Sequence, residues 1–208
     1  MIRLENVTFT YNGSEEKGNL KNINLSIRQG EVILLCGESG CGKTTLTRLI
    51  NGLIPWYYEG ELNGIIKVDG KEIREQPLHI LSQKIGSVFQ NPRSQFFNVD
   101  TTSEIAFSCE NQGLPEDEIR ERIHQTVSLF QIENLIDRNI FHLSGGEKQK
   151  IACASVSAGE PEIFVLDEPS SNLDVAAIED LKHIISCWKS AGKTVIIAEH
   201  RLYYLMEL

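Results

Sequence analysis

The sequence lacks a long apolar run, a cysteine framework and an excess of positive charge. No apolar run approaches the roughly 18 residues of a membrane span, and residues 1–6 do not begin the long apolar stretch of a signal peptide. The five cysteines are scattered without a C-x-x-C pair, which fits reduced thiols better than disulfides or a zinc site. With 20 Lys and Arg against 29 Asp and Glu, the net charge of −9 argues against a general nucleic-acid binder.

The segment Gly37–Thr44 fits the pattern G-x-x-x-x-G-K-[ST] at every fixed position. It follows residues 31–36, a short apolar run that predicts a buried strand, and it precedes residues 44–50, which have apolar residues at helical spacing. Glycines let backbone N–H groups surround a phosphate, and the helix directs its positive end at the same anion. Lys43 is expected to reach the β- and γ-phosphates, and Thr44 to place its hydroxyl on Mg²⁺. The sequence therefore predicts a nucleoside triphosphate site whose residues are Gly37, Glu38, Ser39, Gly40, Cys41, Gly42, Lys43, Thr44 and Thr45.

Strand-like and helix-like segments alternate along the chain, which predicts an α/β fold with a mainly parallel central sheet. The 208 residues suit one large domain with an inserted lobe. We expect a P-loop NTPase core at residues 1–90 and 159–208, with an N-terminal antiparallel β-subdomain, and an inserted α-helical subdomain at residues 91–158. Strands are predicted at residues 2–9, 23–27, 64–70, 84–89, 162–167 and 193–198, and helices at residues 115–130, 144–157 and 175–189.

Two carboxylates end the apolar strand predicted at residues 162–167. At a strand end beside a phosphate loop, Asp167 could hold Mg²⁺ directly or through water. The adjacent Glu168 could act as the base for an attacking water. An Asp-Glu pair after a strand is more often only a solvated strand end, but together with the loop it indicates a hydrolytic site.

The segment Leu143–Gln149 reads LSGGEKQ, in which a serine and two glycines open a predicted helix. This geometry receives anions, although a plain helix cap has the same pattern. The segment resembles the LSGGQ signature of ABC transporter ATP-binding subunits, with Glu147 where Gln is usual, and the resemblance covers nearly the whole chain. Because Ser144, Gly145 and Gly146 are intact, nucleotide contact by these three residues is still expected, and Glu147 is not assigned an essential binding role.

The family resemblance assigns roles to further positions. Gln90 matches the Q-loop glutamine, which approaches Mg²⁺ and the attacking water, and His200 matches the switch histidine that contacts the γ-phosphate. Tyr11 matches the aromatic residue that stacks on adenine, although Phe9 lies close by, and residues 171–174 resemble the D-loop that crosses to a partner subunit. The resemblance thus implies the catalytic set Glu168, His200, Gln90 and Lys43, and the Mg²⁺ set Thr44, Gln90 and Asp167.

The same resemblance implies partners. In this family two ATPase domains face each other head to tail, so each ATP lies between one phosphate loop and the other subunit's signature. Two segments are similar to ATPases of energy-coupling-factor importers, which take up vitamins or transition-metal ions. These segments are residues 90–97 and residues 51–60. Residues 51–60 resemble in particular the members in which two ATPase domains are fused. This implies integral membrane subunits as partners and a location at the cytoplasmic face of the membrane. The segment 90–97 would join the core to a helical lobe that receives a coupling helix, with Phe96 and Phe97 either exposed to the partner or in the core.

Other interpretations remain open. A soluble ABC-type ATPase of translation or DNA maintenance would share these motifs, although such proteins usually carry a second ATPase domain with a long linker or a coiled-coil insertion. A P-loop kinase or GTPase is opposed by the LSGGE segment and by the lack of a guanine-specific N-K-x-D motif. The sequence ends eight residues after His200, where relatives usually continue, so we expect a truncated chain or one half of a fused protein.

Overall fold

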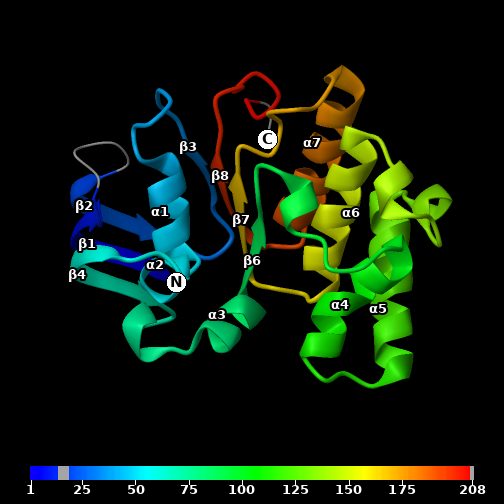
Figure 1. Ribbon diagram of the computed structural model, residues 1–208, viewed down its shortest axis with the longest axis horizontal. Coiled ribbons are helices and arrows are strands. Elements are labelled where there is room, and N and C mark those ends of the chain that lie inside the picture. The colour runs from blue at the N-terminus through cyan, green and yellow to red at the C-terminus, as the bar shows by residue number, and fades with distance from the viewer. Residues whose placement is uncertain (14–18, 207–208) are drawn as a thin grey trace.

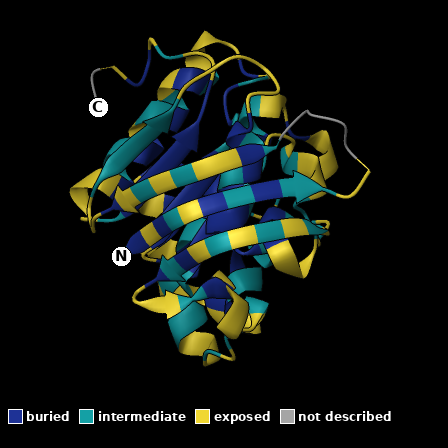
Figure 2. Ribbon diagram, turned by 90° about the vertical axis from the view of Figure 1, so that its left-hand side faces the viewer, coloured by how far each residue is buried: buried dark blue, intermediate teal, exposed yellow. Residues whose placement is uncertain are grey.

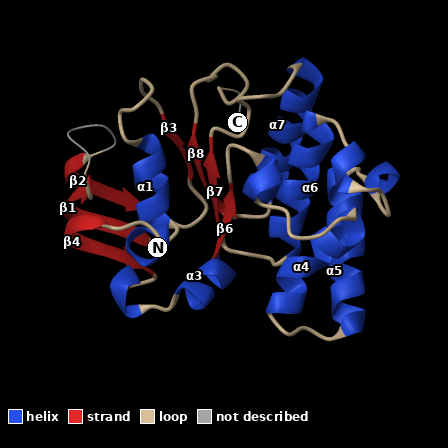
Figure 3. Ribbon diagram, viewed as in Figure 1, coloured by secondary structure: helices blue, strands red, loops and turns tan. Residues whose placement is uncertain are grey.

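The computed structural model describes residues 1–13 and 19–206, and it has the predicted α/β architecture (Figure 1). An antiparallel sheet has the strand order β2-β1-β4-β5, and a parallel sheet has the order β3-β8-β7-β6. Figure 3 shows the antiparallel sheet and helix α1 on one side of the parallel sheet, and α4 to α7 on the other. The mixed sheet pattern and the helical cover confirm the expected fold class.

The antiparallel sheet comes from the N-terminal third of the chain. Its strands are β1 (Ile2–Tyr11), β2 (Leu20–Ile27), β4 (Gly60–Val68) and β5 (Lys71–Glu72). Buried and exposed residues alternate along these strands, as Figure 2 shows, because one face packs on the core and the other meets solvent. Asp69 and Gly70 both have positive φ in the turn between β4 and β5.

The parallel sheet consists of β3 (Val32–Leu35), β6 (Ile85–Val88), β7 (Ile163–Asp167) and β8 (Thr194–Ala198). Strands β7 and β8 are covered on both faces, which explains their unbroken apolar sequence. The prediction of a buried strand at residues 31–36 was wrong in one respect. Within the described residues β3 pairs only with β8, so all four of its residues are half-buried at a sheet edge.

Seven α-helices are described. They are α1 (Lys43–Ile50), α2 (Leu53–Trp56), α3 (Leu78–Lys84), α4 (Thr101–Asn111), α5 (Glu116–Phe130), α6 (Gly145–Ala158) and α7 (Val175–Ser190). Short 3-10 turns lie at Ile73–Glu75, Pro92–Ser94, Glu133–Leu135 and Ile140–His142. The helices predicted at residues 115–130, 144–157 and 175–189 correspond to α5, α6 and α7, whereas α3 and α4 had no clear apolar periodicity and were not individually predicted.

Two hydrophobic cores lie on the two faces of the parallel sheet. Ile163 and Val165 point into the core shared with the antiparallel sheet and α1, whereas Phe164 and Leu166 point into the core shared with α4 to α7. Phe164 stacks on Trp188 of α7 with ring centroids 4.0 Å apart. The carboxyl ends of β7 and β8 are therefore held from both sides, and the residues that follow them are fixed relative to α1.

Candidate functional site

The phosphate loop is an exposed turn that connects β3 to α1. Gly42 caps α1 with φ of 101°, and a Cβ at this position would lie 2.6 Å from Leu20 Cδ2, so glycine is required. Lys43 is 8% exposed, and its ammonium donates to the carbonyl oxygens of Gly37 at 2.9 Å and of Glu38 at 3.0 Å. The Lys43 side chain thus lies across the loop.

The end of β7 brings a carboxylate to the first turn of α1. The Thr44 hydroxyl donates to Asp167 Oδ1 at 3.0 Å, although the two residues are far apart in sequence. Burial raises the pKa of the Asp167 carboxyl, and the hydrogen bond from Thr44 partly opposes this rise. Gln90 lies beside them and donates through Nε2 to Glu168 Oε2 at 2.8 Å, which leaves its amide oxygen available. A hydroxyl, a carboxylate and an amide oxygen form the donor set that suits Mg²⁺.

Glu168 and His200 meet where β7 and β8 end. Glu168 Oε1 lies 2.9 Å from His200 Nε2, and the same ring nitrogen lies 3.2 Å from Lys43 Nζ. One ring nitrogen cannot donate to a carboxylate and accept from an ammonium at once, so these two contacts compete. Glu168 also has φ of 46°, a rare conformation for a residue with a side chain. The structure therefore brings all four predicted catalytic side chains into one continuous set of contacts, those of Lys43, Gln90, Glu168 and His200.

The signature segment forms the N-terminus of α6 and lies on the other side of the parallel sheet from α1 (Figure 1). The Ser144 hydroxyl accepts from Glu147 N, and Glu147 Oε2 accepts from Ser144 N at 2.7 Å, which is a capping box. The hydrogen bond from Ser144 N lowers the pKa of Glu147, which also pairs with Arg138 at 2.9 Å. Glu147 thus has a structural role in the helix cap. Ser144 and Gly145 are exposed, whereas a Cβ on Gly146 would lie 2.6 Å from Ala177 Cβ, so close packing of α6 on α7 requires this glycine.

The aromatic residue predicted to stack on a base lies at the end of β1. Phe9 is fully buried, whereas Tyr11 is half-buried beside α1, so Tyr11 is the nearer of the two to the surface. The Tyr11 hydroxyl lies 3.3 Å from Thr45 Oγ1 and accepts from Arg48 at 3.1 Å. Arg48 also lies over the Tyr58 ring, 4.0 Å from its centroid. The sequence offered no signal for this contact between Arg48 and two tyrosines.

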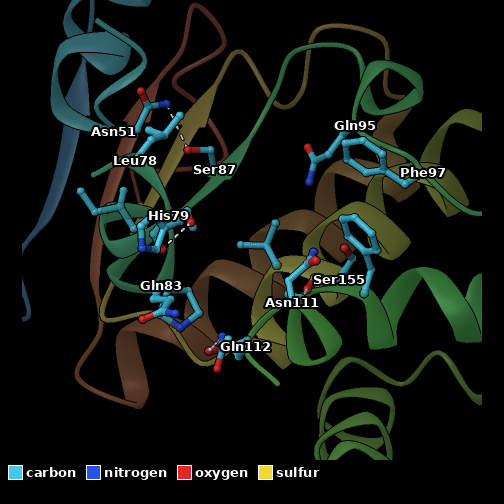
Figure 4. Close-up of a pocket in the computed structure, with 18 of the residues that line it drawn as sticks. Asn51, Leu78, His79, Gln83, Ser87, Gln95, Phe97, Asn111, Gln112 and Ser155 are labelled. Atoms are coloured by element: carbon cyan, nitrogen blue, oxygen red, sulfur yellow. Dashed lines mark hydrogen bonds between the residues drawn. The ribbon is translucent and has the colours of Figure 1, made fainter. Parts of the chain in front are cut away.

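A groove of about 530 Å³ lies between the core and the helical lobe (Figure 4). Phe97 on its wall is 75% exposed and stacks on Phe107 with ring centroids 4.7 Å apart, whereas Phe96 packs partly buried against the helical core. Phe97 is therefore exposed, whereas Phe96 belongs to the edge of the core. Side chains that line the groove include Leu53, Leu78, His79, Gln83, Phe97, Phe107, Asn111 and Gln112.

Together these features define a class of protein. A phosphate loop that opens a helix, a Thr–Asp pair at a strand end and a neighbouring Glu–His pair are the parts of a P-loop nucleoside triphosphatase. A second helix start, capped by a serine and followed by two glycines, distinguishes this chain within that class. The model of the ABC transporter family matches residues 20–171, and the chain belongs to this family of ATPase domains.

Known relatives agree with this assignment. An inferred ABC transporter ATP-binding protein of Treponema denticola is 56% identical over all 208 residues, which span 42% of that protein. One of Pyrococcus horikoshii is 42% identical over 208 residues, which span 73% of it. The chain thus corresponds to less than half the length of the Treponema relative.

Two solved structures share the fold and part of the sequence. The first is cbiO1 from Clostridium perfringens, part of the ABC transporter complex cbiONQ, with a TM-score of 0.84 and 33% identity over 97% of this chain and 78% of that one. The second is the dimeric ATP-binding cassette MJ0796 bound to ADP and Pi, with a TM-score of 0.83 and 27% identity over 98% of this chain and 90% of that one. In the part of the chain that the structure describes, no helix is long and apolar enough to span a bilayer.

Proposed function

We propose that this chain binds and hydrolyses ATP to power a membrane importer of the energy-coupling-factor type, for a vitamin or a transition-metal ion. The observation that carries the proposal is the set of contacts that joins Lys43, His200, Glu168 and Gln90 beside the Thr44–Asp167 pair. A plain nucleotide-binding loop would not need a carboxylate and an imidazole at its open side. The similarity to cbiO1, part of a transporter complex, supports the importer assignment.

Binding comes from the loop and α1. The ammonium of Lys43 and the N–H groups at the start of α1 offset the negative charge of the phosphates. Thr44, Asp167 and Gln90 would hold Mg²⁺, which supplies positive charge to the β- and γ-phosphate oxygens. The Tyr11 ring, at the end of β1, would stack on the adenine.

Hydrolysis depends on the residues that follow β7 and β8. Glu168 accepts a proton from the attacking water, and Gln90 helps to orient that water. His200, which touches both Glu168 and Lys43, contacts the γ-phosphate once ATP separates the three side chains. Catalysis is then mainly positioning and charge neutralisation.

The site is completed by a second ATPase domain. Because α6 lies across the sheet from α1, its exposed N-terminus at Ser144 and Gly145 does not serve the phosphate loop of its own chain (Figure 1). A head-to-tail partner, identical, homologous or fused, would place its ATP against Ser144, Gly145 and Gly146. The dimeric state of MJ0796 supports this arrangement.

Replacement of Lys43 by alanine should weaken ATP binding. The loss of a charge-assisted contact of about 1.5–3 kcal/mol corresponds to roughly a 10- to 100-fold lower affinity. Calorimetric titration with ATP measures this change in affinity. Lys84→Ala is the matched control, because Lys84 pairs with Asp69 away from the loop. Unchanged affinity in the Lys43 variant would contradict the assignment of the loop.

The groove is proposed as the docking site for a membrane subunit. Its walls come from both core and helical lobe, and the segment Gln90–Phe97 runs from Glu168 to the groove. A helix seated there would therefore be coupled to the catalytic residues through this segment. Such docking would hold the chain at the cytoplasmic face of the membrane. A soluble ABC-type ATPase is not favoured, because the relatives carry transporter names.

Replacement of Phe97 by serine should reduce recovery of membrane subunits when the full-length protein is purified from mild detergent. Phe97 offers its exposed ring to a partner, so its loss weakens docking while ATP affinity stays unchanged. Leu129→Ser is the control, because Leu129 is 52% exposed on α5 outside the groove. Equal recovery with both variants would argue against this docking site, and recovery of no membrane protein with the unaltered chain would argue against the importer.

A further inference from the structure

Glu199 is a buried carboxylate that the mechanism above does not use. It follows strand β8 directly and is 1% exposed. Oε1 accepts from its own loop, from His200 N at 2.8 Å and Arg201 N at 3.1 Å. Oε2 accepts from Tyr204 Oη at 3.0 Å and from Ser170 N, in the loop after β7, at 3.3 Å. Burial and the neighbouring Glu199 raise the pKa of Tyr204, which therefore remains a hydroxyl donor.

These bonds join the two loops that carry the catalytic pair. Glu168 lies two residues before Ser170, and His200 directly follows Glu199. At the strand ends the loops are also joined by the bond from Glu168 N to Ala198 O, and further out by Arg201, which donates to Leu173 O at 3.1 Å. Among the described residues, Glu199 is the side chain that crosses between the loops and accepts a hydrogen bond from a backbone N–H of each, Ser170 N in one loop and His200 N in the other.

We infer that Glu199 is a positioning residue for hydrolysis, which fixes the separation of Glu168 and His200 by bonding the backbones of both loops. This inference rests on the proposed ATPase activity. A carboxylate suits the task because it offers acceptors only, and all four of its bonds here come from donors. A glutamine of the same shape would turn one NH₂ group toward two of these donors. The loops after β7 and β8 would then move apart, whereas the phosphate loop would keep its conformation.

Glu199→Gln should lower kcat by about tenfold or more, because small displacements of catalytic groups have large effects. The ATP dissociation constant should stay unchanged, since the four hydrogen bonds of the Glu199 carboxylate go to the loops after β7 and β8 and not to Lys43 or α1. The decisive comparison is made in a His200→Ala background. If Glu199 acts by placing His200, its replacement there causes little further loss. An equal fold loss in both backgrounds would mean that Glu199 does not act by placing His200 and would overturn the inference.

Amide hydrogen exchange tests the same bonds without nucleotide or activity. Glu199→Gln should speed exchange at the Ser170 and His200 amides by roughly 10- to 100-fold, the size of a charge-assisted hydrogen bond. Glu104→Gln is the matched control, because Glu104 is 1% exposed and accepts from Phe97 N and Asn98 N instead. Its replacement should speed exchange at those two amides alone.

The exchange and activity measurements together distinguish the role of Glu199 from the proposed ATPase function. Unchanged exchange at Ser170 and His200 would overturn the role of Glu199 whatever the activity. Faster exchange in a chain that hydrolyses no ATP, alone or with its partner domain, would support the bond network and contradict the proposed function. If Glu199→Gln does not fold, Tyr204→Phe removes one of the four donors and should change both readouts in the same direction by a smaller factor.

Discussion

Replacement of Glu168 by glutamine should reduce steady-state ATP hydrolysis by roughly 10²- to 10⁴-fold, the usual contribution of a general base. The amide cannot take a proton from water, although it nearly preserves the shape of the carboxylate. The Glu168 carboxylate accepts from Gln90 and contacts His200, and within the described residues these side-chain hydrogen bonds do not involve the phosphate loop. The affinity for ATP should therefore change little. Phosphate release measures the first effect and calorimetry the second.

Glu162→Gln provides the control for this experiment. Glu162 is an exposed residue that precedes β7, at the opposite end of the strand from Glu168. The same change of chemistry there should leave turnover unaffected. Steady-state hydrolysis at the normal rate in the Glu168 variant would remove this residue from the catalytic role, whereas loss of ATP binding would show that its main contribution lies elsewhere.

Much of the fold could be predicted because its signals are local. Strand β7 is an apolar run that ends at Asp167 and is followed by Glu168, and helix α5 has its apolar residues at helical spacing after Pro115. The half-buried state of β3 could not be predicted in this way, because an edge strand and a central strand of a parallel sheet can have equally apolar sequences. Helix α4 has buried Thr101 and Glu104 among its residues, which hid its periodicity.

The candidate site, like the fold, could be predicted where its signals are local in the sequence. Motifs identified Lys43, Asp167 and Glu168, because their chemistry depends on residue type and sequence spacing. The contact of His200 with Lys43 and Glu168 depends on how the ends of β3, β7 and β8 align, which no local pattern determines. The role of Glu199 could be predicted only in part. An acidic residue directly after an apolar strand is visible in the sequence, but its four donors come from two loops that only the fold brings together.

The second large effect is expected at the N-terminus of α6. Ser144→Arg should prevent ATP-dependent dimerisation, while each monomer still binds ATP with normal affinity. Ser144 is exposed at the N-cap, where the free N–H groups of the helix would receive the phosphates of the partner's nucleotide. An arginine there occupies the space into which those phosphates must come, so the two faces cannot close. The phosphate loop of the same chain lies across the sheet and is not disturbed.

The measurement is light scattering with ATP in a Glu168→Gln background, where slow hydrolysis preserves the closed state. Arginine also removes the serine cap, which costs about 1 kcal/mol. Ser144→Ala separates the two effects, because it removes the same acceptor for Glu147 N without adding bulk. The alanine variant should therefore still dimerise with ATP, and only the arginine variant should remain monomeric. An ATP-dependent dimer of the arginine variant would contradict the contact between this helix and the partner's nucleotide. The phosphate loop would then have to act without the signature of a second domain.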